Sequence, residues 1–234
     1  MDEKTIEPWC RHDFVLISEQ ERKRIYETLK PSYLGEKSNI IYETFTLNYG
    51  RHGIPGIVRR AENIPQGMIP VGFVPLARFE GNRLRIATFT YVRETDEVIT
   101  PFQVFKMIII PRNNCLKAAL EIAKLAKKLD VSLGIVGSAG IEIMTGLPYT
   151  DGASDLDLLI TNCDSKRLTM VYEQIKIIGE RHQTLIDLEV VLANGYGIKA
   201  IELFMDTQTL LGKSLTTVEL LSREDVLKIM ERGD

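Results

Sequence analysis

The sequence lacks most features that would assign it to a specialised class of protein. It has only 3 cysteines and 1 tryptophan in 234 residues, and no two cysteines show a Cys-X-X-Cys spacing. An odd number of scattered cysteines (Cys10, Cys115 and Cys163) predicts reduced thiols rather than a disulfide framework. The stability of the chain must therefore come from a hydrophobic core, for which 44% hydrophobic residues are ample.

Long apolar runs, a targeting segment and an excess of positive charge are also missing. The longest apolar stretches, such as MIII at 107–110, have the length of a strand, so no membrane span is predicted. The first residues, MDEKTIEPW, lack the positive and apolar regions of a signal peptide. The formal net charge of −3 argues against nonspecific binding of nucleic acid, which usually requires a basic surface. These absences predict a cytoplasmic protein that contacts neither a membrane nor nucleic acid.

The apolar pattern changes along the chain and predicts two domains. The first part contains a helix that begins at the capping box SEQE (18–21) and a loop-rich stretch at 31–56 with one strand at 41–47. The alternation in LRIATFTYV at 84–92 is typical of a strand. We therefore expect a small strand-rich N-terminal domain over residues 1–108.

The remaining residues, 109–234, alternate helices with strands. A helix is predicted at 165–179, closed by Gly179, and two strands are predicted at 184–192 and 197–204. The turn NGYG between these strands favours an antiparallel hairpin. The order of elements predicts an α/β (α+β) fold in which helices flank a mixed sheet.

Two carboxylates interrupt an apolar run in SDLDLLI, where Asp155 and Asp157 lie two residues apart. On a strand both side chains point to the same face, with their backbones about 7 Å apart. Converging side chains could hold two divalent cations roughly 3.5–4 Å apart, as in two-metal phosphoryl-transfer sites. Oxygen ligands favour Mg²⁺ or Mn²⁺. A third carboxylate is expected on a neighbouring strand, where IDLEV supplies Asp187 with Glu189 on the same face.

The Gly-Ser pair at Gly137 and Ser138 follows a predicted strand and opens a helix. Backbone N–H groups and the positive end of the helix dipole can receive phosphate oxygens there, and the serine hydroxyl adds a donor. Taken singly, a Gly-Ser pair is mostly a turn, and an Asp-X-Asp pair is more often a solvated face or a calcium loop. The specific signal is their order: strand, Gly-Ser, helix, Asp-X-Asp strand, then a strand with a third aspartate.

That order resembles the nucleotidyltransferase superfamily, whose members transfer a nucleotide from a triphosphate to a hydroxyl and release pyrophosphate. A closer resemblance is to the phosphoribosyl-dephospho-CoA transferase family of malonate decarboxylase, also called malonate decarboxylase holo-acyl-carrier-protein synthase. The segments that carry it are GS at 137–138, TGLPY at 145–149, SDLDLL at 154–159, IDLEVVLANGYGIKAIEL at 186–203, RHDFVLI at 11–17, IVRR at 57–60 and IPVGF at 69–73.

The resemblance implies a donor, 2'-(5''-triphosphoribosyl)-3'-dephospho-CoA, and an acceptor, a serine of the acyl-carrier protein subunit. Asp155 and Asp157 would hold both ions, and Asp187 would bind the ion that activates the acceptor oxygen. Gly137 and Ser138 would help to bind the leaving pyrophosphate, and Glu189 would orient a ligand or a basic residue. The N-terminal domain would contact the donor or the carrier protein.

Arginines are the expected partners of the donor phosphates, and Arg59 and Arg60 in GIVRR are the candidates. Adjacent residues of a strand face opposite sides, so at most one of them is expected to reach the donor, and surface charge is the alternative for either. The chain also departs from the family pattern. Ile141 and Glu142 stand where the family usually has Trp-Gln, which adds a negative charge near the expected phosphate-binding turn.

Two other functions compete with this interpretation. A nucleotidyltransferase that uses an ordinary nucleoside triphosphate on a small molecule, a protein or RNA would share the same core motif. A non-catalytic carrier-protein-binding module would be expected to lose a carboxylate or the Gly-Ser pair, and all of these residues are present.

Overall fold

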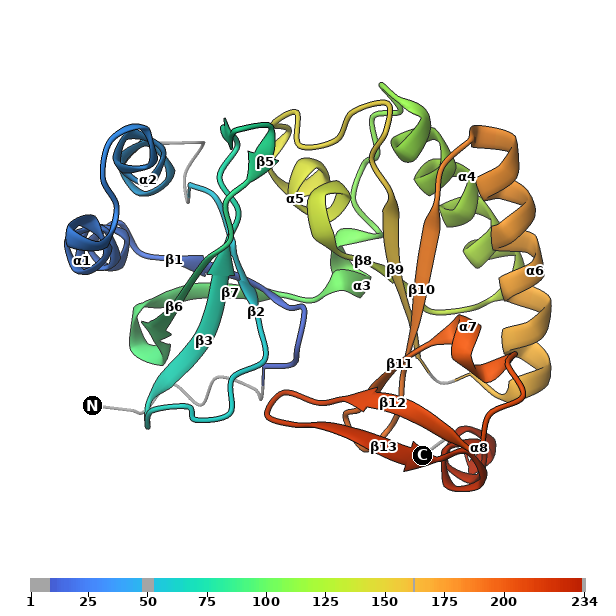
Figure 1. Cartoon of the computed structure of the whole chain (residues 1–234). Helices are drawn as coiled ribbons and strands as arrows, with labels where there is room; N and C mark the ends of the chain where they lie inside the picture. Colours follow the sequence, from blue (N-terminus) through green and yellow to red (C-terminus); the bar gives the residue numbers. More distant parts are fainter. Residues whose placement is uncertain (1–8, 48–52, 162, 233–234) are drawn as a thin grey trace. The chain divides into compact units, whose positions relative to one another are not determined.

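The computed structural model describes residues 9–47, 53–161 and 163–232. The chain divides into two compact units, 1–100 and 101–234, which are described separately below (Figure 1). This division lies earlier than the boundary expected between residues 108 and 109. The difference arises because the short helix α3 (Pro101–Val104) belongs to the second unit.

The first unit is built on an antiparallel sheet with the strand order β6-β3-β2-β1-β7. A separate hairpin joins β4 to β5. The inner strand β1 is buried along its whole length, with β2 on one side and β7 on the other, so its apolar run FVLI shows no alternation. A strand-rich N-terminal half was predicted, and the structure confirms it. The strands are β1 (Phe14–Ile17), β2 (Gly56–Val58), β3 (Met68–Phe73), β4 (Arg78–Phe79), β5 (Asn82–Arg83), β6 (Ile86–Tyr91) and β7 (Thr95–Ile99).

Two helices of the first unit pack against each other. The helix α1 (Glu19–Leu29) begins at the predicted N-cap, since Ser18 Oγ accepts a hydrogen bond from the N–H of Glu21 at 3.1 Å. The N–H of Ser18 donates to the carbonyl of Glu94 instead of the Glu21 side chain, so the reciprocal half of the capping box is replaced. A short 3₁₀ turn, η1 (Lys30–Ser32), follows it. The second helix, α2 (Glu36–Thr46), replaces the strand that we predicted at 41–47, and that prediction was wrong.

The prediction of a strand failed here because the sequence IYETFT is rich in residues that favour strands. Its buried residues nevertheless follow helical spacing, at Ile40, Ile41, Thr44 and Phe45. The ring of Phe45 packs edge-on against that of Phe73 in β3, with the ring centroids 4.9 Å apart. Tertiary packing of one helical face therefore outweighs the local propensity.

A buried carboxylate precedes β1. Asp13 is 5% exposed and accepts a hydrogen bond from the N–H of Cys10 at 2.7 Å. Loss of hydration raises the pKa of Asp13 from 3.8 to about 6, although the Cys10 hydrogen bond and the nearby His12 act in the opposite direction. Because the folded pKa lies above the unfolded one, folding favours the protonated acid. The contribution of Asp13 to stability is thus fully present below about pH 4 and is lost as the pH rises through about 6.

We expect Asp13→Asn to remove this pH dependence, because the amide still offers an acceptor to Cys10 but cannot ionise. Between about pH 4 and about pH 7, the free energy of unfolding of the parent should fall relative to the variant by about 2 kcal/mol. Urea unfolding of both proteins across this range measures the difference. Glu62→Gln, which changes an exposed carboxylate of the same unit, is the control. If the difference in free energy of unfolding between the parent and Asp13→Asn stays constant with pH, the raised pKa of Asp13 is contradicted.

The second unit contains a mixed sheet with the strand order β13-β12-β11-β10-β9-β8. Only β9 and β10 run parallel, and the other neighbouring pairs are antiparallel. The predicted mixed sheet and the hairpin of β10 and β11 are confirmed, whereas the hairpin of β12 and β13 was not predicted. The strands are β8 (Leu133–Ile135), β9 (Leu156–Thr161), β10 (Ile186–Val191), β11 (Gly197–Lys199), β12 (Thr209–Lys213) and β13 (Val218–Ser222).

The long helices α4 and α6 contact each other and the strands β9 and β10 (Figure 1). Shorter helices complete the unit, and α7 takes up the second half of the strand that we predicted at 197–204. The helices besides α3 are α4 (Asn114–Leu129), α5 (Gly137–Thr145), α6 (Ser165–His182), α7 (Ala200–Leu203) and α8 (Arg223–Arg232). None of the helices in the described part of the chain combines the length and the apolar character needed to cross a membrane.

The helix α6 does not end at Gly179, as we predicted, but continues to His182 with Gln183 as its C-cap. A Cβ on Gly179 would lie 2.9 Å from the carbonyl oxygen of Thr184. The glycine therefore allows the chain that follows the helix to pass close to it, and this is its structural role rather than helix termination.

Candidate active site

The parallel pairing of β9 and β10 brings the predicted carboxylates together. Asp157 and Asp187 are direct partners in this ladder, so their side chains point to the same face of the sheet. Asp155 lies immediately before β9, two residues from Asp157, and is exposed. Glu189 lies two residues beyond Asp187 on the same face and is half-buried.

The opposite face of β9 is fully buried. Leu156, Leu158 and Ile160 are at most 1% exposed, whereas Asp157 between them is only half-buried. One strand therefore contributes to the core on one side and carries charge on the other. This explains how aspartates can stand within an apolar run without the full cost of burying a charge.

Gly137 places the start of α5 against the carboxylate of Asp157. Its φ is 64°, and a Cβ at this position would lie only 2.6 Å from Asp157 Oδ2. The preceding Val136 donates its N–H to the backbone oxygen of Asp157 at 3.1 Å. As the N-cap residue, Val136 offers no side-chain hydrogen bond to the first turn of α5, in which the half-buried Ser138 also lies. The first turn of α5, with the positive end of its helix dipole, therefore lies against the negative charge of Asp157.

A lysine that the sequence analysis did not identify completes this face. Lys199 is the direct partner of Glu189 in the antiparallel ladder of β10 and β11, and its Nζ donates to Oδ2 of Asp187 at 2.6 Å. The hydrogen bond to Asp187, together with the charges of Asp187, Asp157 and Glu202, raises the pKa of Lys199. The signal for Lys199 was present in the sequence, because a hairpin through NGYG pairs these two strands.

Arg59 and Arg60 belong to the first unit and follow β2, which ends at Val58. The strand predicted at 56–60 is therefore shorter, and the argument that the two arginines face opposite sides of it no longer applies. Arg59 is half-buried, with its guanidinium 6.0 Å from the ring centroid of Phe89, and its Nη1 donates to the carbonyl of Arg60 at 3.0 Å. Its Nε is buried and has no hydrogen-bond partner among the described residues. Arg60 is exposed.

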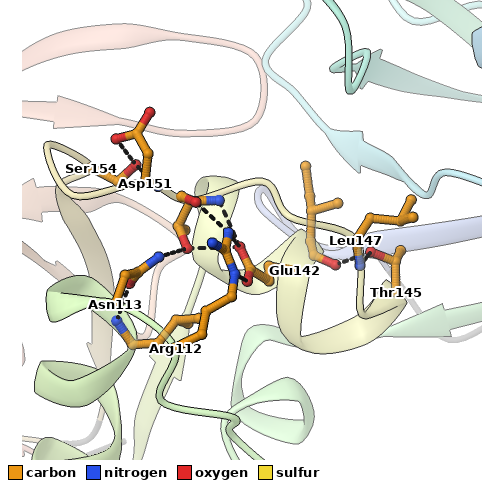
Figure 2. Close-up of polar contacts among 10 residues, drawn as sticks. Arg112, Asn113, Glu142, Thr145, Leu147, Asp151 and Ser154 are labelled. Carbon is orange, nitrogen blue, oxygen red and sulfur yellow. Dashed lines mark hydrogen bonds and ion pairs between the residues drawn. The ribbon is translucent and has the colours of Figure 1, made fainter.

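Glu142 is not the free negative charge that the sequence suggested. It is 7% exposed, and both of its carboxylate oxygens accept hydrogen bonds from Arg112, at 2.5 and 3.0 Å (Figure 2). The backbone N–H and the hydroxyl of Thr150 also donate to it, at 2.6 and 2.7 Å. Burial by itself would raise the pKa of Glu142, but the hydrogen bonds from Arg112 and Thr150 outweigh burial and lower it. The negative charge that Glu142 adds near the expected phosphate-binding turn is therefore paired with the positive charge of Arg112.

The same contacts fix the loop that delivers Asp155 to the sheet. Arg112 also bonds the carbonyl of Thr150, and Asn113 Nδ2 donates to the Thr150 hydroxyl at 2.7 Å. Asn113 is in turn the N-cap of α4, since its side chain accepts from the N–H of Leu116. We call Arg112, Asn113, Glu142 and Thr150 the loop clamp. It joins the start of α4, the middle of α5 and the chain just before the Asp-X-Asp motif.

The carboxylates of this face can be compared with the ligands that a divalent cation requires. All the candidate ligands on this face are carboxylates, which is the donor type that Mg²⁺ and Mn²⁺ prefer, and Asp157 and Asp187 are neighbours by register. As the side chains lie, no three His, Cys, Asp or Glu residues among 9–47, 53–161 and 163–232 are placed to hold an ion together, and Asp187 is bound to Lys199. The residues fit a divalent cation by donor type and by register, provided that Asp187 exchanges Lys199 for it.

A helix that opens at Gly-Ser against an Asp-X-Asp strand of a mixed sheet is the arrangement expected of a transferase that handles phosphate groups. The family model described as the phosphoribosyl-dephospho-CoA transferase MdcG C-terminal domain matches residues 103–224, and the chain belongs to this family. It is also 23% identical over 220 residues to a phosphoribosyl-dephospho-CoA transferase of Bradyrhizobium diazoefficiens, covering 94% of this chain and 93% of that protein. No solved structure matches the chain. The resemblance inferred from the sequence motifs is thus confirmed.

Proposed function

We propose that the protein transfers the phosphoribosyl-dephospho-CoA group from 2'-(5''-triphosphoribosyl)-3'-dephospho-CoA to a serine of the malonate decarboxylase acyl-carrier protein. The serine oxygen attacks the α-phosphorus, the bond to the leaving pyrophosphate breaks, and a phosphodiester joins carrier and prosthetic group. The family supports the transferred group. The observation that carries the reaction type is the pairing of Asp157 with Asp187 next to the start of α5.

The residues of this face divide the work of positioning and charge stabilisation. Asp155, Asp157 and Asp187 would hold Mg²⁺ or Mn²⁺, and the bound metal would neutralise the negative charge that develops on the phosphates and the leaving group. Asp187 accepts the proton of the attacking serine. Backbone N–H groups at Gly137 and Ser138, with the serine hydroxyl, receive phosphate oxygens.

The other predicted residues have supporting roles. Glu189, as the ladder partner of Lys199, helps to orient that ammonium beside Asp187. Arg59 or Arg60 binds a phosphate of the donor. The buried Nε of Arg59, which has no hydrogen-bond partner within residues 9–47, 53–161 and 163–232, favours Arg59 for this role. The first unit binds the donor or the carrier protein.

The test is intact-mass spectrometry of the apo acyl-carrier subunit after incubation with this protein, Mg²⁺ and the triphosphoribosyl donor, with ATP alone in a parallel reaction. We expect a mass gain equal to the phosphoribosyl-dephospho-CoA group, and we expect the gain to disappear when Asp155 is replaced. Addition of a nucleotide from ATP, without addition from the triphosphoribosyl donor, would favour an ordinary nucleotidyltransferase instead. No covalent change with either donor would favour a non-catalytic carrier-binding module.

Gly137→Ala is expected to reduce this transfer by about 100-fold, because a displacement of about 1 Å at a reacting centre costs that much. The new Cβ cannot occupy the same space as Asp157 Oδ2, and the positive φ adds backbone strain. Gly152→Ala is the matched control, since a Cβ there meets nothing within 4 Å, and it should retain transfer to within about twofold. Full activity of the Gly137 variant in the mass assay would show that this contact is not part of the active geometry.

A further inference from the structure

Lys199 is paired with Asp187, the carboxylate that was expected to bind the ion that activates the acceptor oxygen. The Nζ atom is 2.6 Å from Asp187 Oδ2, which is the distance of a charge-assisted hydrogen bond. Lys199 is also the residue immediately before α7, so its backbone position is fixed by a strand on one side and a helix on the other. A side chain of this chain thus already supplies a positive charge to the third carboxylate.

Several carboxylates gather on the face that carries Lys199. Asp157 of β9 and the two residues Asp187 and Glu189 of β10 point to the same face, and Asp155 lies immediately before β9. A divalent cation would be attracted to these carboxylates more strongly than a monovalent one.

The ion pair is also accessible to solvent. The side chain of Lys199 is 44% exposed and that of Asp187 is 39% exposed. Exposed pairs of this kind contribute little stability, because water screens the charges and two flexible side chains must be held in place. Replacement of the ammonium by a divalent cation therefore requires no unfolding and breaks only a weak interaction.

We propose that Lys199 is a positioning residue for Asp187 that competes with a divalent cation for the same carboxylate. In the metal-free protein it holds Asp187 in the orientation seen here, and a cation that binds Asp187 must displace it. Lys199 thereby sets the divalent-cation affinity at the third carboxylate. The inference rests on the proposed function, because it takes Asp187 to be a metal ligand in the phosphoryl transfer.

The competition is tested by calorimetric titration of Mn²⁺ into the full-length chain without donor or acceptor. Lys199→Met removes the ammonium and keeps a side chain of similar length, and it should lower the Kd for Mn²⁺ by at least about fivefold. Lys199→Arg retains the charge and should leave the Kd close to that of the parent. Lys213→Met removes a lysine from the neighbouring strand β12, where Lys213 is the ladder partner of Gly197, and should also leave it unchanged.

A double variant separates competition at Asp187 from a general effect of charge. In the Asp187→Asn background, Lys199→Met should no longer strengthen Mn²⁺ binding, because the carboxylate for which the two cations compete is absent. An unchanged or weaker affinity in Lys199→Met would overturn the proposal, and so would a gain that persists in the Asp187→Asn background. Failure of every variant to bind Mn²⁺ would overturn it as well.

This titration is independent of the transfer assay. Tighter Mn²⁺ binding in Lys199→Met, with no mass gain on the carrier protein, would leave the competition standing and refute the proposed function. A mass gain on the carrier, with Mn²⁺ affinity unaffected by Lys199, would support the function and refute the competition. The two proposals can therefore fail separately.

Discussion

Replacement of Asp157 by Asn is expected to reduce transfer to the carrier protein by roughly 1,000-fold while the fold is retained. The amide cannot replace a carboxylate as a ligand of a divalent cation. The backbone contact of Asp157 with the N–H of Val136 does not involve the side chain, so the junction of β8, α5 and β9 should persist. Asp155→Asn should lose transfer in the same way. The rate of mass gain on the apo carrier subunit measures both losses.

The stability of the Asp157 variant provides the second readout. Asp157 and Asp187 are like charges placed side by side as partners in the ladder of β9 and β10. Removal of one charge should therefore leave the free energy of unfolding in EDTA unchanged or higher. Asp206→Asn, at an exposed position of the same unit, is the control for both readouts. Unimpaired turnover would remove Asp157 from the metal site, and a large loss of stability would make it a structural residue.

The placement of the candidate carboxylates could be predicted from the sequence because it depends on short-range geometry. The period of two along a strand puts Asp155 and Asp157 on one face, and a neighbouring strand with an aspartate at the same level is a simple expectation. Lys199 was harder to find, because its position depends on the register of a hairpin. Val191 pairs with Gly197, so the connection occupies residues 192–196, and only this length brings Lys199 opposite Glu189 and beside Asp187.

The errors in the fold have a common physical cause, which is that contacts between distant segments determine the local structure. The first unit gains α2 because one helical face of 36–46 is buried, although the local composition favours a strand. The hairpin of β12 and β13 escaped notice because apolar residues such as Leu211 and Leu220 lie on an exposed face and give no clear alternation.

The loop clamp could not be predicted from the sequence, because it also consists of contacts between distant segments. Breaking it is expected to have the largest effect on stability. Glu142→Gln should lower the free energy of unfolding by about 3 kcal/mol, at the lower end of the cost of breaking a buried ion pair because Arg112 is partly exposed. The amide removes the charge opposite Arg112. If its oxygen stays at the position that accepts both Thr150 hydrogen bonds, its NH2 donor is turned towards Nε of Arg112, which requires an acceptor. Urea unfolding of the parent and the variant near neutral pH measures the loss.

The pH dependence of this loss has a definite sign. The pKa of Glu142 in the folded state lies below its usual value of 4.5, so its contribution is present above that value and disappears as the pH falls through the folded pKa. The parent and Glu142→Gln should therefore converge in stability under acidic conditions. A difference that remains equally large there would mean that the contribution of Glu142 does not depend on its charge.

The double variant Glu142→Gln with Arg112→Met tests why this chain has a glutamate where the family it resembles usually has glutamine. Arg112→Met alone should also be destabilising, because it leaves a buried carboxylate without its counter-charge. The double variant should lose less stability than the sum of the two single variants, since neither an unpaired charge nor an unmatched guanidinium remains. Strict additivity would show that Arg112 and Glu142 act separately. A favourable coupling energy would show that the ion pair of Arg112 and Glu142 takes the place of an uncharged contact. The ion pair would then hold the loop that carries Asp155 to the sheet.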